Sequence, residues 1–149
     1  MVRIMLDTNA VLDLVLNRYP DRHASMLGAV SRCKEGTHEL LVCAHSLMDM
    51  THIIENNAGM KAAMPNKADR QACARSARET AFRFCKVCSV DDQTCRSAHG
   101  DEGEGDFEDA VVKACARAHE AHAVVTSDRR AFVSNDILKL TPAEFERFV

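Results

Sequence analysis

The stretch VRIMLDTNAVLD (residues 2–13) joins a short apolar run to an amphipathic pattern through a single aspartate. Residues 2–6 have the length and composition of a strand buried inside a parallel sheet. Thr8 and Asn9, which follow Asp7, are suited to satisfy the free N–H groups at the start of a helix. The apolar positions of that helix are Val11, Leu12, Val15 and Leu16. We therefore expect Asp7 at the carboxyl edge of a strand, where open α/β sheets bind ligands.

The rest of the chain repeats this alternation of strand and helix. Further strands are expected at residues 39–44, 84–90, 121–126 and 137–140. Helices are expected at residues 22–34, from Ser46 onward, at 67–82, 91–98, from Asp106 onward, at 129–132 and from Thr141 onward, with a connector at 56–65. The alternation predicts an α/β/α fold of three layers around a central parallel sheet of four to five strands. With no repeat or linker, residues 1–149 form one expected domain.

The composition excludes several classes of protein. Of the 149 residues 46% are hydrophobic but only 5% aromatic, so the core must be aliphatic, and no aromatic platform for stacking single-stranded nucleic acid is visible. The apolar runs are shorter than the roughly 20 residues of a membrane helix. The first run ends at Asp7, unlike a signal peptide. These features predict a cytoplasmic protein without a membrane partner.

The net charge of −3 is unevenly distributed along the chain. A basic group comprises Lys61, Lys67, Arg70, Arg75, Arg78 and Arg83, and an acidic run comprises Asp101, Glu102, Glu104, Asp106, Glu108 and Asp109. The basic group is suited to meet phosphates, although a solvated helix face has the same pattern. The acidic run is suited to hold cations.

The seven cysteines are expected to be small buried apolar residues of a reducing compartment. Cys85, Cys88, Cys95 and His99 have a spacing compatible with zinc. However, residues three apart on the strand expected at 84–90 face opposite sides of the sheet. Cys85 and Cys88 are therefore not expected to share a metal ion.

Each acid of interest also has a purely structural interpretation. Asp49 stands three residues after Ser46 and is placed to close a capping box, while Asp106 and Asp128 are placed to cap the helices that follow them. Asp13 is expected at a solvated helix position. The acids expected to be loop or surface charges are Glu102, Glu104 and Glu108.

The functional interpretation rests on convergence of these acids. In a parallel sheet every junction from strand to helix lies on one edge, which gathers Asp7, Asp49 and Asp128 with either Asp106 or Asp109. Neighbouring carboxylates raise one another's pKa values unless a cation neutralises them. An all-oxygen site favours Mg²⁺ or Mn²⁺, ions that assist the hydrolysis of phosphodiesters.

Four segments of the chain resemble those of PIN-domain ribonucleases, most of all the VapC-like toxins of bacterial toxin–antitoxin pairs. They are LDTNAVLD (6–13), GDFEDAVVKACA (105–116), VVTSDRRAF (124–132) and the closing LTPAEF (140–145). The resemblance extends from Met1 to Phe148 and implies a PIN-like fold.

The resemblance also assigns roles to individual residues. Asp7, Asp109 and Asp128 match family acids that hold the metal, and Asp106 matches an additional acid of one branch. The remaining catalytic acid of the family is usually Glu in the helix after the second strand. Asp49 takes that position here, with Glu55 as a second candidate. The family positions that support the site by hydrogen bonds are matched by Asn9 and Thr126.

The activity implied is an endoribonuclease that uses Mg²⁺ or Mn²⁺ and leaves 5′-phosphate and 3′-hydroxyl ends. A cognate antitoxin and a homodimer are further implications of the resemblance. Candidates for contact with RNA are Arg129, Arg130, Arg70, Arg75 and Arg78.

Two alternatives remain open at this point. A PIN-like module that binds RNA or protein with little or no catalysis is favoured by Asp49, which is one methylene shorter than Glu. A haloacid-dehalogenase-like phosphatase also places an aspartate after its first strand. That family has a second aspartate two residues later, where this chain has Asn9.

Overall fold

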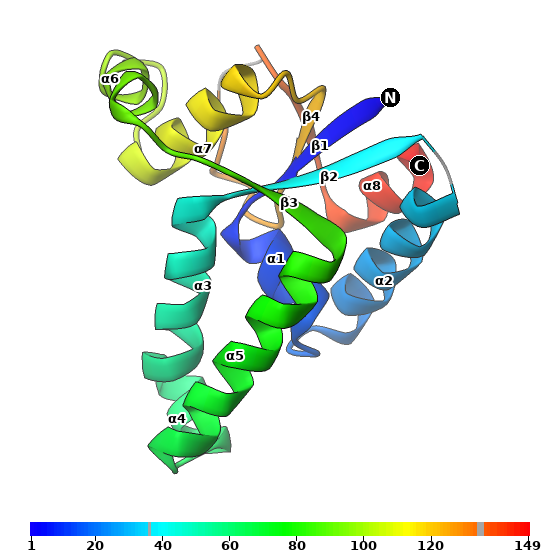
Figure 1. Cartoon of the computed structure of the whole chain (residues 1–149), viewed down its shortest axis with the longest axis vertical. Coiled ribbons are helices and arrows are strands. Elements are labelled where there is room, and N and C mark those ends of the chain that lie inside the picture. Colours follow the sequence, from blue (N-terminus) through cyan, green and yellow to red (C-terminus); the bar gives the residue numbers. More distant parts are fainter. Residues whose placement is uncertain (36, 134–135) are drawn as a thin grey trace.

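A computed structural model describes residues 1–35, 37–133 and 136–149 of the chain, with the backbone alone described at residues 34 and 35. Its centre is a five-stranded sheet of order β3-β2-β1-β4-β5, in which all neighbouring strands are parallel (Figure 1). The strands are β1 (Val2–Leu6), β2 (His38–Cys43), β3 (Cys85–Cys88), β4 (Ala123–Val125) and β5 (Leu138–Leu140). The predicted parallel sheet is confirmed.

Helices cover both faces of this sheet and complete the three predicted layers (Figure 1). One face carries α1 (Thr8–Val15), α2 (Pro20–Glu35), α3 (Ala44–Asn56), α4 (Ala58–Ala63), α5 (Lys67–Phe84) and α8 (Pro142–Phe148). The other face carries α6 (Asp92–His99) and α7 (Phe107–Ala118). In the part of the chain described, no helix is long and apolar enough to cross a membrane.

Side-chain alternation along the central strands produces two separate apolar cores. Ile4 and Leu6 of β1 join the core beneath the larger helical layer, whereas Met5 between them joins the core beneath α6 and α7. On β3, Cys85 and Cys88 likewise face opposite cores. The expectation that these two cysteines do not face one another is confirmed.

Local signals in the sequence fix several helix ends. Asp7 caps α1 by accepting a hydrogen bond from the Ala10 amide, and Asp106 caps α7. Thr141 and Glu144 form the expected capping box of α8, with proline in its first turn.

Two expectations about where helices form were wrong. The expected connector at 56–65 contains α4, which Asn57 caps through the amide of Gly59. The helix expected at 129–132 is instead a turn, and Phe132 has a φ of 54°, a left-handed conformation that does not continue a right-handed helix.

Candidate metal centre

Carboxylates from four separate segments line one pocket of about 160 Å³ at the carboxyl edge of the sheet. Its lining residues are Asp7, Thr8, Asn9, His45, Asp49, Asp106, Glu108, Asp109, Val112 and Asp128. No lysine or arginine is among these described lining residues. The structure therefore brings together every acid that the convergence argument named.

Asp7 is the most buried carboxylate of this pocket, with 5% of its surface exposed. As the cap of α1 it accepts a hydrogen bond of 2.8 Å from the Ala10 amide, and the Thr126 hydroxyl also donates to it. Burial raises the pKa of Asp7 to about 7, the negative charge of Asp109 adds to this rise, and the two hydrogen bonds oppose it. Thr126 thus lies beside Asp7, and its supporting role, which the family resemblance implies, stays a prediction.

Asp109 lies in the first turn of α7, half-buried. Burial raises the pKa of Asp109 to about 6, and the charges of Asp106 and Asp128 contribute to the same rise. Asp106, which is exposed, accepts hydrogen bonds from the amides of Glu108 (2.8 Å) and Asp109 (3.2 Å). Asp106 thus combines its predicted capping role with a place in the pocket.

Asp128 enters the pocket from the turn that follows β4. Its carboxylate accepts a hydrogen bond of 2.8 Å from the Arg130 amide, and its own amide donates to the Thr126 hydroxyl oxygen at 3.0 Å. The cap predicted for a helix is therefore a turn closed by the aspartate side chain. Since Thr126 contacts both Asp7 and Asp128, one hydroxyl group orients two pocket acids.

Asp49 lines the pocket from α3 and is half-buried. The capping box expected between Ser46 and Asp49 was wrong, because α3 already begins at Ala44 after the cap residue Cys43. Asp49 therefore lies beyond the first turn, and its carboxylate is available to the pocket. Glu55, the second candidate, lies near the other end of α3 and does not line the pocket.

Two acids that were expected at the surface are buried, and a third lies at the pocket. Asp13 is 1% exposed, and burial raises its pKa although Ser127 and Arg22 oppose the rise. Glu104 is buried, and its carboxylate accepts a hydrogen bond of 2.9 Å from the Val133 amide. Glu108 is exposed as expected, but it lies at the pocket.

A buried lysine of α7 holds the loops on either side of the pocket. Lys113 is completely buried, and its ammonium lies 2.6 Å from Asp101, 3.8 Å from Glu104 and 3.9 Å from Asp136. The first two acids belong to the loop that ends at Asp106, and the third follows the segment of Asp128. Lys113 thereby fixes the two segments that carry pocket acids to one helix.

The candidate RNA contacts separate into two groups. Arg129 and Arg130 are exposed beside Asp128, and Arg75 is exposed with an ion pair of 3.5 Å to Glu79. Arg78 is half-buried and donates to the Thr51 hydroxyl oxygen at 3.1 Å.

Arg70 differs from the other candidates because its guanidinium is bound inside the fold and is not free to contact RNA. It is 7% exposed, and its guanidinium donates to the carbonyl oxygens of Glu55, Met64 and Pro65 at 2.7–2.8 Å. These bonds occupy Arg70 in joining α3, α4 and α5.

His45 lines the pocket but was not predicted. Its Nε2 lies 3.6 Å from a carboxylate oxygen of Glu108. His45 stands two residues after the end of β2, and a position just after a strand is the feature by which the acids were identified.

The donor set of this pocket fits a hard divalent cation. Six of its lining residues carry carboxylates, namely Asp7, Asp49, Asp106, Glu108, Asp109 and Asp128, which supply the oxygen ligands that Mg²⁺ and Mn²⁺ prefer. The raised pKa values of Asp7 and Asp109 reflect burial and mutual repulsion. A cation bound among these carboxylates offsets the cost of burying their negative charges and weakens their mutual repulsion.

Comparison with known proteins agrees with this geometry. The family model described as "PIN domain" matches residues 3–130. The chain matches none of the curated proteins with which it was compared.

Among solved structures, the fold is similar to that of VapBC2 from Rickettsia felis bound to a DNA fragment from its promoter. The TM-score is 0.66 at 11% identity, over 94% of this chain and 98% of that chain. DNA-bound VapBC from Salmonella typhimurium gives a TM-score of 0.66 at 17% identity, over 95% and 99% of the chains. VapC20 from Mycobacterium tuberculosis, a toxin that cleaves the sarcin-ricin loop, gives 0.57 at 18% identity, over 81% and 86%.

Proposed function

This chain belongs to the PIN domain family, and from that premise we propose that it is an endoribonuclease dependent on Mg²⁺ or Mn²⁺. The observation that carries the proposal is the pocket in which Asp7, Asp109 and Asp128 meet without a neighbouring lysine or arginine among its described lining residues. Without a metal ion, such a pocket repels a phosphodiester. With one, the same carboxylates become its ligands.

In this proposal Asp7, Asp109 and Asp128 hold the metal, with Asp49 or Asp106 completing the set. Held by these residues, Mg²⁺ or Mn²⁺ would supply polarisation of the phosphoryl oxygen and a lowered pKa of water. The Thr126 hydroxyl keeps Asp7 oriented. Asn9 lines the pocket and is placed to bind a polar group there. The products expected carry 5′-phosphate and 3′-hydroxyl ends.

The exposed guanidinium groups of Arg129 and Arg130 are proposed to bind the RNA backbone beside this pocket, with weaker contributions from Arg75 and Arg78. Their position next to Asp128 supports this role. Positive charge outside an acidic pocket draws a polyanion to the metal without competing for its ligands.

We further propose that the protein is the toxin of a toxin–antitoxin pair, acting as a homodimer on cytoplasmic RNA and inhibited by a cognate antitoxin. The proposal is supported by the similarity of fold to chains of two VapBC structures and to the toxin VapC20. One similar protein, VapC20, is described as cleaving the sarcin-ricin loop, which makes structured ribosomal RNA a reasonable first substrate to test.

The test is cleavage of end-labelled structured and unstructured RNA by purified protein with Mn²⁺ or Mg²⁺. Chelator and Asp7→Asn are each expected to lower cleavage at least about 100-fold, because both remove metal from the pocket. Asp92→Asn, which changes an exposed aspartate in the first turn of α6, is the matched control and should cleave like the wild type. Cleavage that survives in Asp7→Asn contradicts the proposal.

A binding module with weak or no catalysis is the second candidate, favoured by Asp49 where the family usually has glutamate. It predicts Mn²⁺ binding to the folded protein without RNA cleavage. Asp49→Glu extends the carboxylate by one methylene, and a gain of cleavage in this variant would identify the missing reach as the cause.

A further inference from the structure

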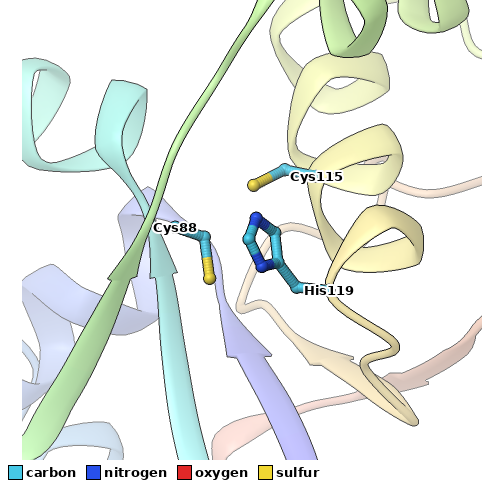
Figure 2. A group of neighbouring side chains, drawn as sticks. All are labelled: Cys88, Cys115 and His119. Atoms are coloured by element: carbon cyan, nitrogen blue, oxygen red, sulfur yellow. The ribbon is translucent and has the colours of Figure 1, made fainter.

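A second group of metal-ligating side chains lies at the opposite end of α7 from the acidic pocket. Cys88 is the last residue of β3, Cys115 belongs to the last turn of α7, and His119 follows directly after that helix (Figure 2). The two sulfur atoms and one ring nitrogen of His119 all lie within 4.8 Å of one another. None of these residues lines the acidic pocket.

The fold brings these three side chains together and holds them there. Cys115 and His119 are four residues apart, so they lie on one face of the helical turn, and the His119 amide donates to the Cys115 carbonyl oxygen at 3.1 Å. Arg3 donates to the His119 carbonyl oxygen at 3.3 Å, which fixes this residue from β1. Cys88 approaches from β3, and Figure 2 shows the imidazole directed into the space between the two thiols.

We propose that Cys88, Cys115 and His119 bind a zinc ion that joins the edge strand β3 to α7. Two thiolates and one neutral imidazole are typical ligands of Zn²⁺, and they balance its charge, as a buried site requires. Mg²⁺ and Mn²⁺ prefer oxygen ligands, so the two sites select different ions.

The distances are close to those that a metal site needs. Tetrahedral zinc places its sulfur and nitrogen ligands roughly 3.5–3.8 Å apart, as follows from bonds of about 2.3 Å and 2.0 Å. Atoms within 4.8 Å reach this geometry through side-chain shifts of about 1 Å. Cys43 pairs with Cys88 across the β2–β3 ladder on the same face of the sheet, so it lies next to this group without belonging to it.

The thiols near His119 differ in pKa from the thiol of Cys85, which lies on the opposite face of β3. Contact with the Cys115 thiol lowers the pKa of Cys43 to about 6 and also lowers that of Cys88, and the same contacts raise the pKa of Cys115. Burial raises the pKa of Cys85 to about 12. The three thiols near His119 thus share protons with one another, whereas Cys85 remains a neutral thiol, and zinc binding would release the proton of Cys115.

The surroundings of His119 also suit a ligand. His119 is half-buried while Cys88 and Cys115 are buried, so the imidazole side is the route by which an ion reaches the sulfur atoms. Asp91, the cap of α6, lies close enough to His119 for their charges to interact. A carboxylate near a ligating histidine is a common feature of zinc sites.

The site is tested by titrating the reduced protein with Co²⁺, which replaces zinc in thiolate sites and reports its ligands in the absorption spectrum. A thiolate-to-cobalt charge-transfer band with tetrahedral d–d bands is expected at one equivalent, and one equivalent of Zn²⁺ should abolish both. Asp7→Asn should leave the spectrum unchanged, because an oxygen-only site gives no thiolate band. This readout is independent of ribonuclease activity.

Variants assign the ligands. Cys88→Ala and Cys115→Ala should remove the charge-transfer band, whereas Cys85→Ala, which changes a buried cysteine on the same strand but the other face, should keep it. Since a buried variant can fail to fold, His119→Ala at the half-buried position is the second test, with cobalt affinity expected to fall at least about tenfold. No band in the wild type, or an unchanged spectrum and affinity in His119→Ala, would overturn the proposal.

Discussion

Asp7 has two roles that make opposite demands on its carboxyl group. As the cap of α1 and the acceptor of the Thr126 hydroxyl it is stabilised as an anion, but its burial among other carboxylates favours the protonated form. Burial prevails, and the pKa rises from 3.8 to about 7. At neutral pH the metal-free pocket therefore lowers the stability of the fold that builds it.

This conflict predicts a pH dependence of stability. Between pH 4 and pH 7 the folded state retains a proton on Asp7 that the unfolded state has lost, so the free energy of unfolding falls as pH rises through this range. The full shift corresponds to at most about 4 kcal/mol. Urea unfolding in chelator at pH 5 and pH 7.5 should show a smaller fall for Asp7→Asn than for the wild type. Equal falls in both proteins would contradict the assignment.

The arginines allow a second prediction about single residues. Arg129→Ala should weaken RNA binding and lower the slope of log affinity against log salt by about 1, because one phosphate contact is lost. Arg70→Ala should leave this slope unchanged and lower the free energy of unfolding by about 2 kcal/mol, because three carbonyl oxygens lose their donor. Salt-dependent binding and urea unfolding of both variants separate the two roles. A lower salt slope in Arg70→Ala would refute this division.

The surroundings of a charged residue could be predicted only where the sequence also showed that it stands at the end of a strand or the start of a helix. Asp7, Asp109 and Asp128 lie where strands end or helices begin, so the rule for parallel sheets placed them at one edge. Asp13 and Glu104 are buried where they meet Ser127 and Val133, which lie far along the chain, whereas Arg70 is buried beside the nearby carbonyl groups that it binds. Charged residues are usually exposed, and no local pattern announces a partner that lies elsewhere in the chain.

The helix α7 connects the acidic pocket to the interior of the protein. Its first turn carries Asp109, and its next turn carries Lys113, which is surrounded by Asp101, Glu104 and Asp136. The order of the loops around the pocket thus depends on an ion-pair network in the core. Such a network keeps the pocket acids in place before any metal binds.

Lys113→Met tests this role of the helix. Methionine fills a similar volume but leaves the buried Glu104 without its cation and Asp101 with Arg117 alone, so the free energy of unfolding should fall by about 3–5 kcal/mol. Lys86→Met, at a position where 62% of the side chain is exposed, should change it by less than about 1 kcal/mol. Equilibrium urea unfolding of both variants provides the comparison, and similar losses would contradict the network.

Elements with strong local signals were predicted well, and weakly marked ones were not. The strand at residues 2–6 and the capping box of α8 match their expected positions. The six-residue α4 lacks any buried residue, so no apolar periodicity marked it. At 129–132, an aspartate followed by arginines resembled a helix start, but the Asp128 side chain closes a turn instead.

Metal binding should be visible in the stability of the whole protein. Mn²⁺ at 100 times its dissociation constant should raise the free energy of unfolding by about 2.7 kcal/mol, which corresponds to a melting temperature higher by roughly 8 °C for a domain of this size. Asp109→Asn should lose most of this shift, and Cys85→Ala should keep it. Thermal unfolding followed by circular dichroism measures all three, and a full shift in Asp109→Asn would exclude Asp109 as a ligand.

The position of β1 in the sheet also bears on the order of events during protein synthesis. β1 pairs with β4, where Ile4 lies beside Ala123, and the pocket acid that stands farthest along the sequence, Asp128, follows that strand. A chain synthesised only as far as β3 has Asp7 and Asp49 but lacks Asp106, Asp109 and Asp128, so it cannot build the complete pocket. If the pocket holds the metal of a ribonuclease, as we propose, the active site forms only after β4 has docked beside β1.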